Sequence, residues 1–189
     1  NIYDIIYTEG SKSNSVNVTR IIEEKSLSEI EMVEYAEDFF LSIGFKPLPD
    51  TFWERSLFVK PNDRSVVCHA SAWNLDPANN DLRIKMCIEK NEEDFITIHH
   101  ELGHIFYYQA YNHLPYLFQG GANDGFHEAF GDLLTLSITP DYLMNIGFIS
   151  EDEATIAKED PIGLLMKQAL EGVVVIPWAL MLDKWRSGV

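Results

Sequence analysis

The stretch "IHHELGHIFYY" at residues 98–108 contains the pattern H-E-x-x-H at His100, Glu101 and His104. Residues four apart lie on one face of an α-helix, with Cβ atoms roughly 5–6 Å apart, so the two imidazoles can bind one tetrahedral Zn²⁺. Glu101 stands beside the first histidine, where it can take a proton from a water that the metal activates. The alternative is a helix that carries two histidines in structural roles.

The segment "GANDGFHEAFGDLL" (121–134) offers a third metal ligand. A catalytic zinc usually takes three protein ligands and one water. Glu128 stands on a predicted helix, and Asp132 follows one turn later, where it can accept a hydrogen bond from a ligand imidazole. We expect this helix to be largely buried, because five of its residues are apolar: Phe126, Ala129, Phe130, Leu133 and Leu134. Buried carboxylates need a partner, whereas an exposed acidic face is the alternative.

Capping signals and apolar periodicity predict a mainly α-helical fold around this stretch. Asn91 can cap a helix over residues 92–111. Ser28 and Glu31 form a capping box that opens another helix, and Gly44 ends it. We expect further helices at residues 126–137, from 140 to 147, after Ser150 and from 161 onward. The first 25 residues are expected to form a short helical start followed by a loop.

Residues 65–73 and 82–88 are β-like, and the stretch "NLDPANND" between them is rich in turn-forming residues. We expect an antiparallel pair, which would bring Cys68 and Cys87 close together. Two cysteines can form a disulfide or remain buried free thiols. Asn17 begins an N-V-T sequon, which is a glycosylation site if the protein is secreted.

The chain has 189 residues, of which 46% are hydrophobic, and we expect one domain over residues 1–189 with no internal boundary. Lys and Arg number 14 against 30 Asp and Glu, which gives a formal net charge of −16. Such a surface repels phosphate backbones and anionic lipid heads, so nucleic acid and membrane surfaces are disfavoured as partners. We attribute the acidity to solubility rather than to the steering of cationic substrates.

Seven segments of the chain resemble the angiotensin-converting enzyme (peptidyl-dipeptidase A) family of zinc metallopeptidases. These are "NIYD" (1–4), "FWERSLFVKP" (52–61), "VVCHASAW" (66–73), "LRIK" (82–85), "HHELGHIFYY" (99–108), "GANDGFHEAFGDLLTLS" (121–137) and "DKWR" (183–186). The resemblance implies a mainly α, gluzincin-type metallopeptidase fragment with a short antiparallel β-pair near the active site.

The resemblance also implies the composition of a zinc centre. His100, His104 and Glu128 match the family's zinc ligands, and Glu101 matches its general base. Asp132 matches the carboxylate that supports a ligand from outside the metal shell. Zn²⁺ is therefore the expected cofactor.

Two other features of the family map to the β-like region. Cys68 and Cys87 match a family disulfide. His69, Ala70 and Ser71 match a strand that lines the substrate peptide, a role that fits the addition of an extended peptide to a strand edge. Taken alone, His69 would be read as a structural histidine.

The other histidines and two departures from the family carry less weight. We expect His99, His113 and His127 to be structural or solvated. Asp124 stands where the family usually has Pro, which changes the stiffness of a loop. Ser187 stands where the family has a Trp that helps to bind an activating chloride, and this weakens the expectation of chloride as a second cofactor.

The expected activity is the zinc-dependent release of C-terminal dipeptides from oligopeptides with a free C-terminus. We expect an extracellular protein, secreted or anchored as an ectodomain, of which this chain is a fragment. Any membrane contact would then involve parts outside the chain. The family's carboxylate-binding and oxyanion-stabilising residues would also lie outside it, so the isolated fragment is expected to be inactive. The alternatives are an inactive homologue that acts as a binding or receptor protein, and another gluzincin such as an aminopeptidase.

Overall fold

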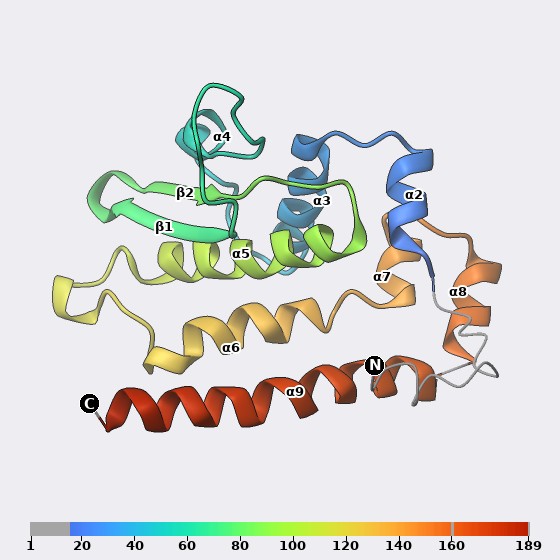
Figure 1. Cartoon of the computed structure of the whole chain (residues 1–189). Helices are drawn as coiled ribbons and strands as arrows, with labels where there is room; N and C mark the ends of the chain where they lie inside the picture. Colours follow the sequence, from blue (N-terminus) through green and yellow to red (C-terminus); the bar gives the residue numbers. More distant parts are fainter. Residues whose placement is uncertain (1–15, 160, 189) are drawn as a thin grey trace. The chain divides into compact units, whose positions relative to one another are not determined.

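A computed structural model describes residues 16–159 and 161–188, and the chain divides into two compact units. One unit covers residues 17–142, and the other includes the residues from 143 onward. The described residues are mainly α-helical with one two-stranded sheet, which confirms the expected fold class (Figure 1). The expectation of one uninterrupted domain stays a prediction.

Helix α5 (Glu92–Tyr111) is the central element of the first unit and has the predicted bounds. The side chain of Asn91 accepts a hydrogen bond from the Asp94 backbone N–H at 2.7 Å. Three acidic residues in the first turn stabilise the helix, because their negative charges lie at the positive end of the helix dipole. In Figure 1, α5 lies between the β-pair and α6, and it contacts both. Its apolar face is fully buried through four side chains: Phe95, Ile98, Leu102 and Ile105.

Helix α3 (Glu29–Ser42) packs on α5 and begins with the predicted capping box. A Glu31 carboxylate oxygen accepts from the Ser28 backbone N–H at 2.7 Å, and the Ser28 hydroxyl accepts from the Glu31 N–H at 3.2 Å. The ring of Phe40 stacks on Phe106 of α5 with centroids 4.3 Å apart. Gly44 follows the helix with φ +101°, a conformation that glycine adopts without strain.

Helix α2 (Val18–Glu24) lies where a loop was expected, so that prediction was wrong. The Asn17 side chain caps it by accepting from the Arg20 N–H at 2.9 Å. Val18, Ile21 and Ile22 bury one helical stripe, and this packing outweighs the polar composition of the segment. Residues 1–15, and with them the expected helical start and the "NIYD" segment, lie outside the described residues.

The two strands pair as predicted, but their bounds differ from the expected ones. Strand β1 (Ser71–Asp76) runs antiparallel to β2 (Asp81–Lys85), with a 3₁₀ turn η1 (Pro77–Asn79) between them. Residues 65–70 precede the strand, whereas residues 74–76 belong to it. The side chain of Asp76 accepts from two N–H groups of the turn, which fixes the start of the turn at Pro77. A disulfide joins Cys68 and Cys87, so the pairing implied by the resemblance is present.

A short helix, α4 (Asp50–Arg55), was not predicted from the sequence. The fully buried ring of Phe52 anchors it. Arg55 donates to Asp81 at 2.8 Å, and Arg83 donates to the same carboxylate at 2.8 Å. These hydrogen bonds, with Arg83 first, lower the pKa of Asp81 to about 2. The ion pairs therefore link α4 to the turn end of β2.

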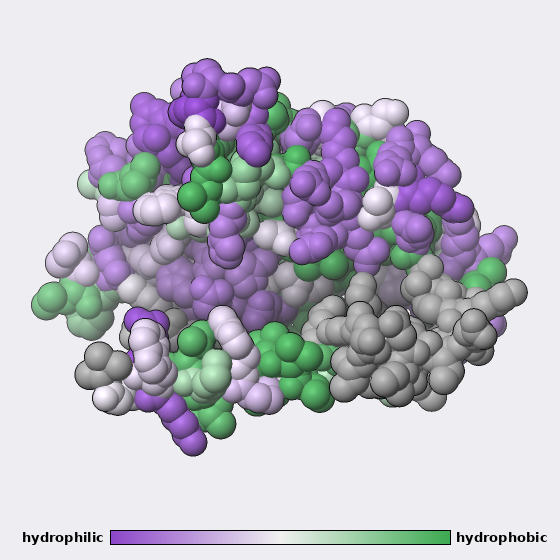
Figure 2. Space-filling model, in the orientation of Figure 1, coloured by the Kyte–Doolittle hydropathy of each residue, from purple (hydrophilic) through white to green (hydrophobic). Residues whose placement is uncertain are grey.

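The remaining helices follow the predicted order. Helix α6 (Asp124–Thr135) precedes α7 (Pro140–Asn145), α8 (Glu151–Lys158) and α9 (Pro161–Ser187). Ser150 and Glu153 form the predicted capping box of α8. Figure 2 shows apolar side chains on the later, described part of α9, and the exposed residues of this helix include Val173, Val174, Ile176, Trp178 and Trp185. None of the helices in the described ranges combines the length and apolar character that a membrane span requires.

Candidate metal centre

The candidate centre forms where two glycines let α5 and α6 approach closely. A Cβ atom at Gly103 would lie 2.9 Å from the Cα of Gly131, and a Cβ at Gly131 would lie 2.8 Å from Nδ1 of His100. Real Cβ atoms almost never come so close, so only glycine, which has no side chain, fits at both positions. The H-E-x-x-H turn of α5 is thereby placed directly against α6.

The three expected ligand atoms face one another across this contact. The Nε2 atoms of His100 and His104 are 3.1 Å apart. Oε2 of Glu128 lies 3.2 Å from the first nitrogen and 3.7 Å from the second. Tetrahedral zinc with bonds of 2.0–2.1 Å requires ligand atoms roughly 3.3 Å apart. Two imidazole nitrogens and a carboxylate oxygen also match the donors that zinc prefers, so these residues fit a zinc ion.

Exposure differs sharply between the two helices of the centre. The side chains of His100 and His104 are 20% and 10% exposed, whereas those of Glu128 and Asp132 are 71% and 75% exposed. The expectation of a largely buried second helix was therefore wrong. Helix α6 contacts α5 through a narrow stripe at Gly131 and Leu134, and three of its apolar residues are exposed: Phe126, Ala129 and Leu133.

The expected supporting carboxylate and the expected base both lie beside the ligands. Asp132 places a carboxylate oxygen 3.0 Å from Nδ1 of His100, the nitrogen that faces away from the ligand triangle. Glu101 is 6% exposed, and burial raises the pKa of its carboxyl, against the opposing effect of His100. A buried carboxylate with a raised pKa is a better proton acceptor near neutral pH. The roles of both residues stay predictions.

The expected substrate-lining segment lies at the entry to β1. His69 and Ala70 precede the strand, and Ser71 is its first residue. His69 is exposed, and its Nδ1 lies 2.7 Å from the carbonyl oxygen of Ala70. The charge of His69 also lowers the pKa of the Glu101 carboxyl, although burial has the larger, opposite effect.

His99 and His113 behave as expected, and His127 has a contact that was not predicted from the sequence. His99 is fully buried, and its Nδ1 donates to the carbonyl oxygen of Phe95 at 2.8 Å. His113 is exposed beyond the end of α5. His127 was expected to be structural or solvated, and its Nδ1 lies 3.2 Å from Nδ1 of His104. The tyrosines around it follow His104 by three, four and seven residues on one helical face, and this spacing was the signal in the sequence.

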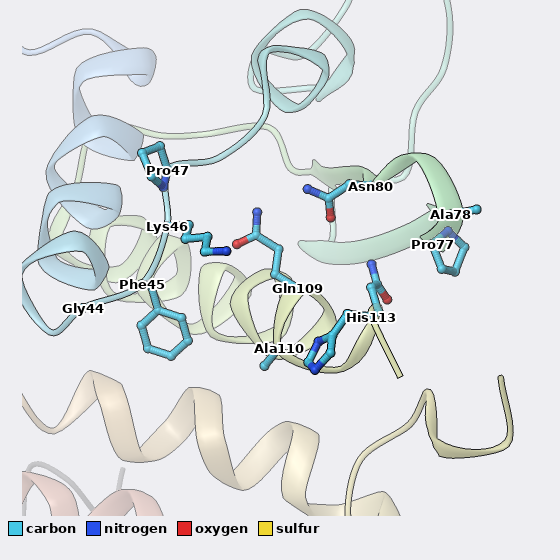
Figure 3. Close-up of a pocket in the computed structure, with 11 residues that line it drawn as sticks. Gly44, Phe45, Lys46, Pro47, Pro77, Ala78, Asn80, Gln109, Ala110 and His113 are labelled. Atoms are coloured by element: carbon cyan, nitrogen blue, oxygen red, sulfur yellow. The ribbon is translucent and has the colours of Figure 1, made fainter. Parts of the chain in front are cut away.

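A cavity of about 580 Å³ lies apart from the metal centre (Figure 3). Lys46, from the loop after α3, and Gln109 of α5 point toward each other across it. Pro77 and Asn80 of the β-turn, together with His113, also line the cavity. The residues that line the cavity do not include the expected metal ligands, Glu101 or Asp132. A molecule bound in the cavity would therefore not contact the H-E-x-x-H turn.

The glycosylation of Asn17 stays a prediction. Asn17 is exposed, and its Oδ1 atom accepts the capping hydrogen bond of α2. The Thr19 hydroxyl accepts from the Glu92 backbone N–H at 2.9 Å, which ties α2 to the start of α5. The amide nitrogen of Asn17, the atom that glycosylation modifies, takes no part in the cap.

Comparison with known proteins gives consistent matches along the chain. A family model described as angiotensin-converting enzyme matches residues 1–189. Angiotensin-converting enzymes of Bos taurus and Mus musculus are each 42% identical to the chain, over 98% and 100% of its length. The chain spans 14% of each of these two relatives. The same enzyme of Haematobia irritans exigua is 43% identical over 83% of this chain and 26% of its own length.

Proposed function

Because this chain belongs to the angiotensin-converting enzyme family of metallopeptidases, we propose that it carries the zinc centre of a peptidyl-dipeptidase. The proposed reaction is the release of C-terminal dipeptides from oligopeptides with a free C-terminus. The observation that carries the proposal is the ligand triangle of His100, His104 and Glu128, with Glu101 beside it.

In this proposal each residue of the centre has a separate chemical role. Zinc held by the three ligands would supply Lewis-acid chemistry, lowering the pKa of a water and polarising the scissile carbonyl. Glu101 takes a proton from that water as the oxygen of the water attacks the carbonyl carbon. The same carboxyl then donates the proton to the amine nitrogen as the C–N bond breaks. Asp132 accepts from Nδ1 of His100 and holds that ring in the orientation the metal needs.

The β-pair supports a place for the substrate. Strand β1 pairs with β2 along one edge, and no other described strand pairs with its second edge. An extended peptide can add to such an edge through main-chain hydrogen bonds. Ser71 is the first residue of β1, and His69 and Ala70 directly precede it. We assign these three residues to substrate contact.

The disulfide between Cys68 and Cys87 supports an extracellular location, either secreted or as an anchored ectodomain. It fixes the segment that enters β1 to the segment that follows β2. In that environment the exposed Asn17 would be available for glycosylation.

The test uses the full-length protein and a blocked tripeptide with a chromogenic leaving dipeptide. We expect turnover with a free C-terminal carboxylate and none with the amidated peptide. Glu101→Gln should retain zinc and lose turnover, and His104→Ala should lose zinc. Cleavage of the amidated substrate, or activity on an aminopeptidase substrate alone, would contradict the proposed specificity. Survival of activity in Glu101→Gln would contradict the role of the base.

A further inference from the structure

His127 of α6 contacts a predicted metal ligand on the side that faces away from the metal. Its Nδ1 atom lies 3.2 Å from Nδ1 of His104, and the rings stack with centroids 5.4 Å apart. The Nε2 atom of His104 points instead at the ligand triangle, 3.1 Å from Nε2 of His100. One ring therefore links α6 to the metal centre through His104.

The position of His127 is fixed by its other neighbours. Its Nε2 lies 2.9 Å from the hydroxyl oxygen of Tyr111. The rings of Tyr107 and Tyr108 lie with centroids 4.5 Å and 4.8 Å from it. A Cβ at Gly121 would lie 3.2 Å from Cδ2 of His127, so the loop before α6 also closes on the ring. The ring is held by aromatic packing on several sides and by a hydrogen bond at each nitrogen.

The proton positions along this chain of hydrogen bonds determine whether His104 can bind a metal. Two Nδ1 atoms in contact must share a single proton. If His104 holds it, its Nε2 has a free lone pair, and His127 then donates from Nε2 to the Tyr111 oxygen. If His127 holds it, a neutral His104 carries its own proton on Nε2, where it blocks the ligand atom.

We propose that His127 is a positioning residue for His104. Its Nδ1 accepts a hydrogen bond from the Nδ1–H of His104, which keeps Nε2 of His104 free for zinc. The Tyr111 hydroxyl oxygen accepts a hydrogen bond from Nε2 of His127 and so keeps the proton of His127 on that nitrogen. The inference rests on the proposed zinc centre. The two imidazole ligands then differ in their outer partners. His100 donates to the Asp132 carboxylate, 3.0 Å away, whereas His104 donates to a neutral ring. The neutral partner adds no negative charge to the centre.

The experiment measures zinc dissociation constants of the full-length protein by competition with a chromogenic chelator. His127→Phe retains an aromatic ring but has no acceptor, so zinc affinity should fall roughly 10–100-fold. His127→Asn places an amide oxygen near the position of Nδ1 and should restore most of that loss. His113→Phe is the matched control, because His113 is exposed beyond α5, and its affinity should equal that of the wild type.

If His127 had a purely structural role, His127→Asn would bind zinc no more tightly than His127→Phe. Recovery of zinc affinity in the Asn variant is therefore the decisive result. Wild-type affinity in His127→Phe would overturn the inference, as would an Asn variant no tighter than the Phe variant. If His127→Phe does not fold, Tyr111→Phe takes its place, and it should weaken zinc binding by about 10-fold or less. Unchanged affinity in Tyr111→Phe would then overturn the inference. A wild-type protein that binds no zinc would instead refute the proposed function.

Discussion

Replacing Gly103 with alanine should weaken zinc binding by moving α6 away from α5. The added Cβ would lie 2.9 Å from the Cα of Gly131, and ordinary contact begins at 3.4 Å, so α6 must move by about 0.5 Å. Glu128 moves with α6, while the two histidine ligands stay on α5. Metal–ligand distances tolerate shifts of only about 0.2 Å. We therefore expect zinc affinity to fall roughly 10–100-fold, as when a supporting partner is lost.

The cost to folding should be smaller, because two effects oppose each other. Overpacking of a close contact typically costs about 1–3 kcal/mol. Alanine in a helix interior regains about 1 kcal/mol over glycine. We expect the metal-free variant to lose at most about 2 kcal/mol of unfolding free energy. Chelator competition measures the zinc affinity, and urea unfolding in excess chelator measures the stability.

The matched control for this change is Gly125→Ala in α6. A Cβ there meets only the Asn123 side-chain oxygen at 3.5 Å, which is an ordinary contact. This variant should bind zinc as the wild type does. If Gly103→Ala bound zinc as tightly as Gly125→Ala, the close approach of the helices would not be what places the third ligand, and the reasoning would fail.

Three further predictions concern the stability of the fold. The arginine hydrogen bonds hold the pKa of Asp81 at about 2 against 3.8 when unfolded; Asp81→Asn should therefore lower the urea midpoint at neutral pH, and its difference from wild type should disappear between about pH 4 and pH 2. Cys87→Ser opens the bridge to Cys68, across a sequence separation of 19, and should cost about 3 kcal/mol of unfolding free energy by the loop-entropy relation; a loss below about 1 kcal/mol would contradict that estimate. Ser28→Ala removes the cap of α3 and should cost about 1 kcal/mol in the same assay, whereas no loss would show that the cap is energetically idle.

The elements that local chemistry determines were predicted well from the sequence. Asn91 caps α5, and Ser28 and Ser150 open α3 and α8, because each side chain satisfies backbone donors a few residues away. The bounds of α5 agree with the prediction for the same reason. The pairing of the β-stretches was also predicted, although Asp76 shifted the turn by capping it from inside the expected loop.

The features that were missed depend on contacts between distant segments. Helix α4 is stable because Phe52 is buried, and its local sequence shows no strong start signal. The exposure of α6 could not be inferred from its apolar content, since that depends on which stripe contacts α5. His100, His104 and Glu128 were predicted as a set of ligands, and the structure brings these side chains together, while their role as ligands stays a prediction. The contact of His127 with His104 was missed because the two residues lie 23 apart in the sequence.

The unequal exposure of the ligands has a consequence for how metal enters and leaves the centre. The side chains of the two histidines are only 20% and 10% exposed, while those of Glu128 and Asp132 face solvent. An incoming ion can therefore meet the carboxylates first and lose its water molecules stepwise before it reaches the nitrogens. In the proposed centre, metal exchange would then require only the swing of the exposed Glu128 side chain, and the core around α5 would stay packed. Loading of the proposed centre would thus be a surface event that follows folding.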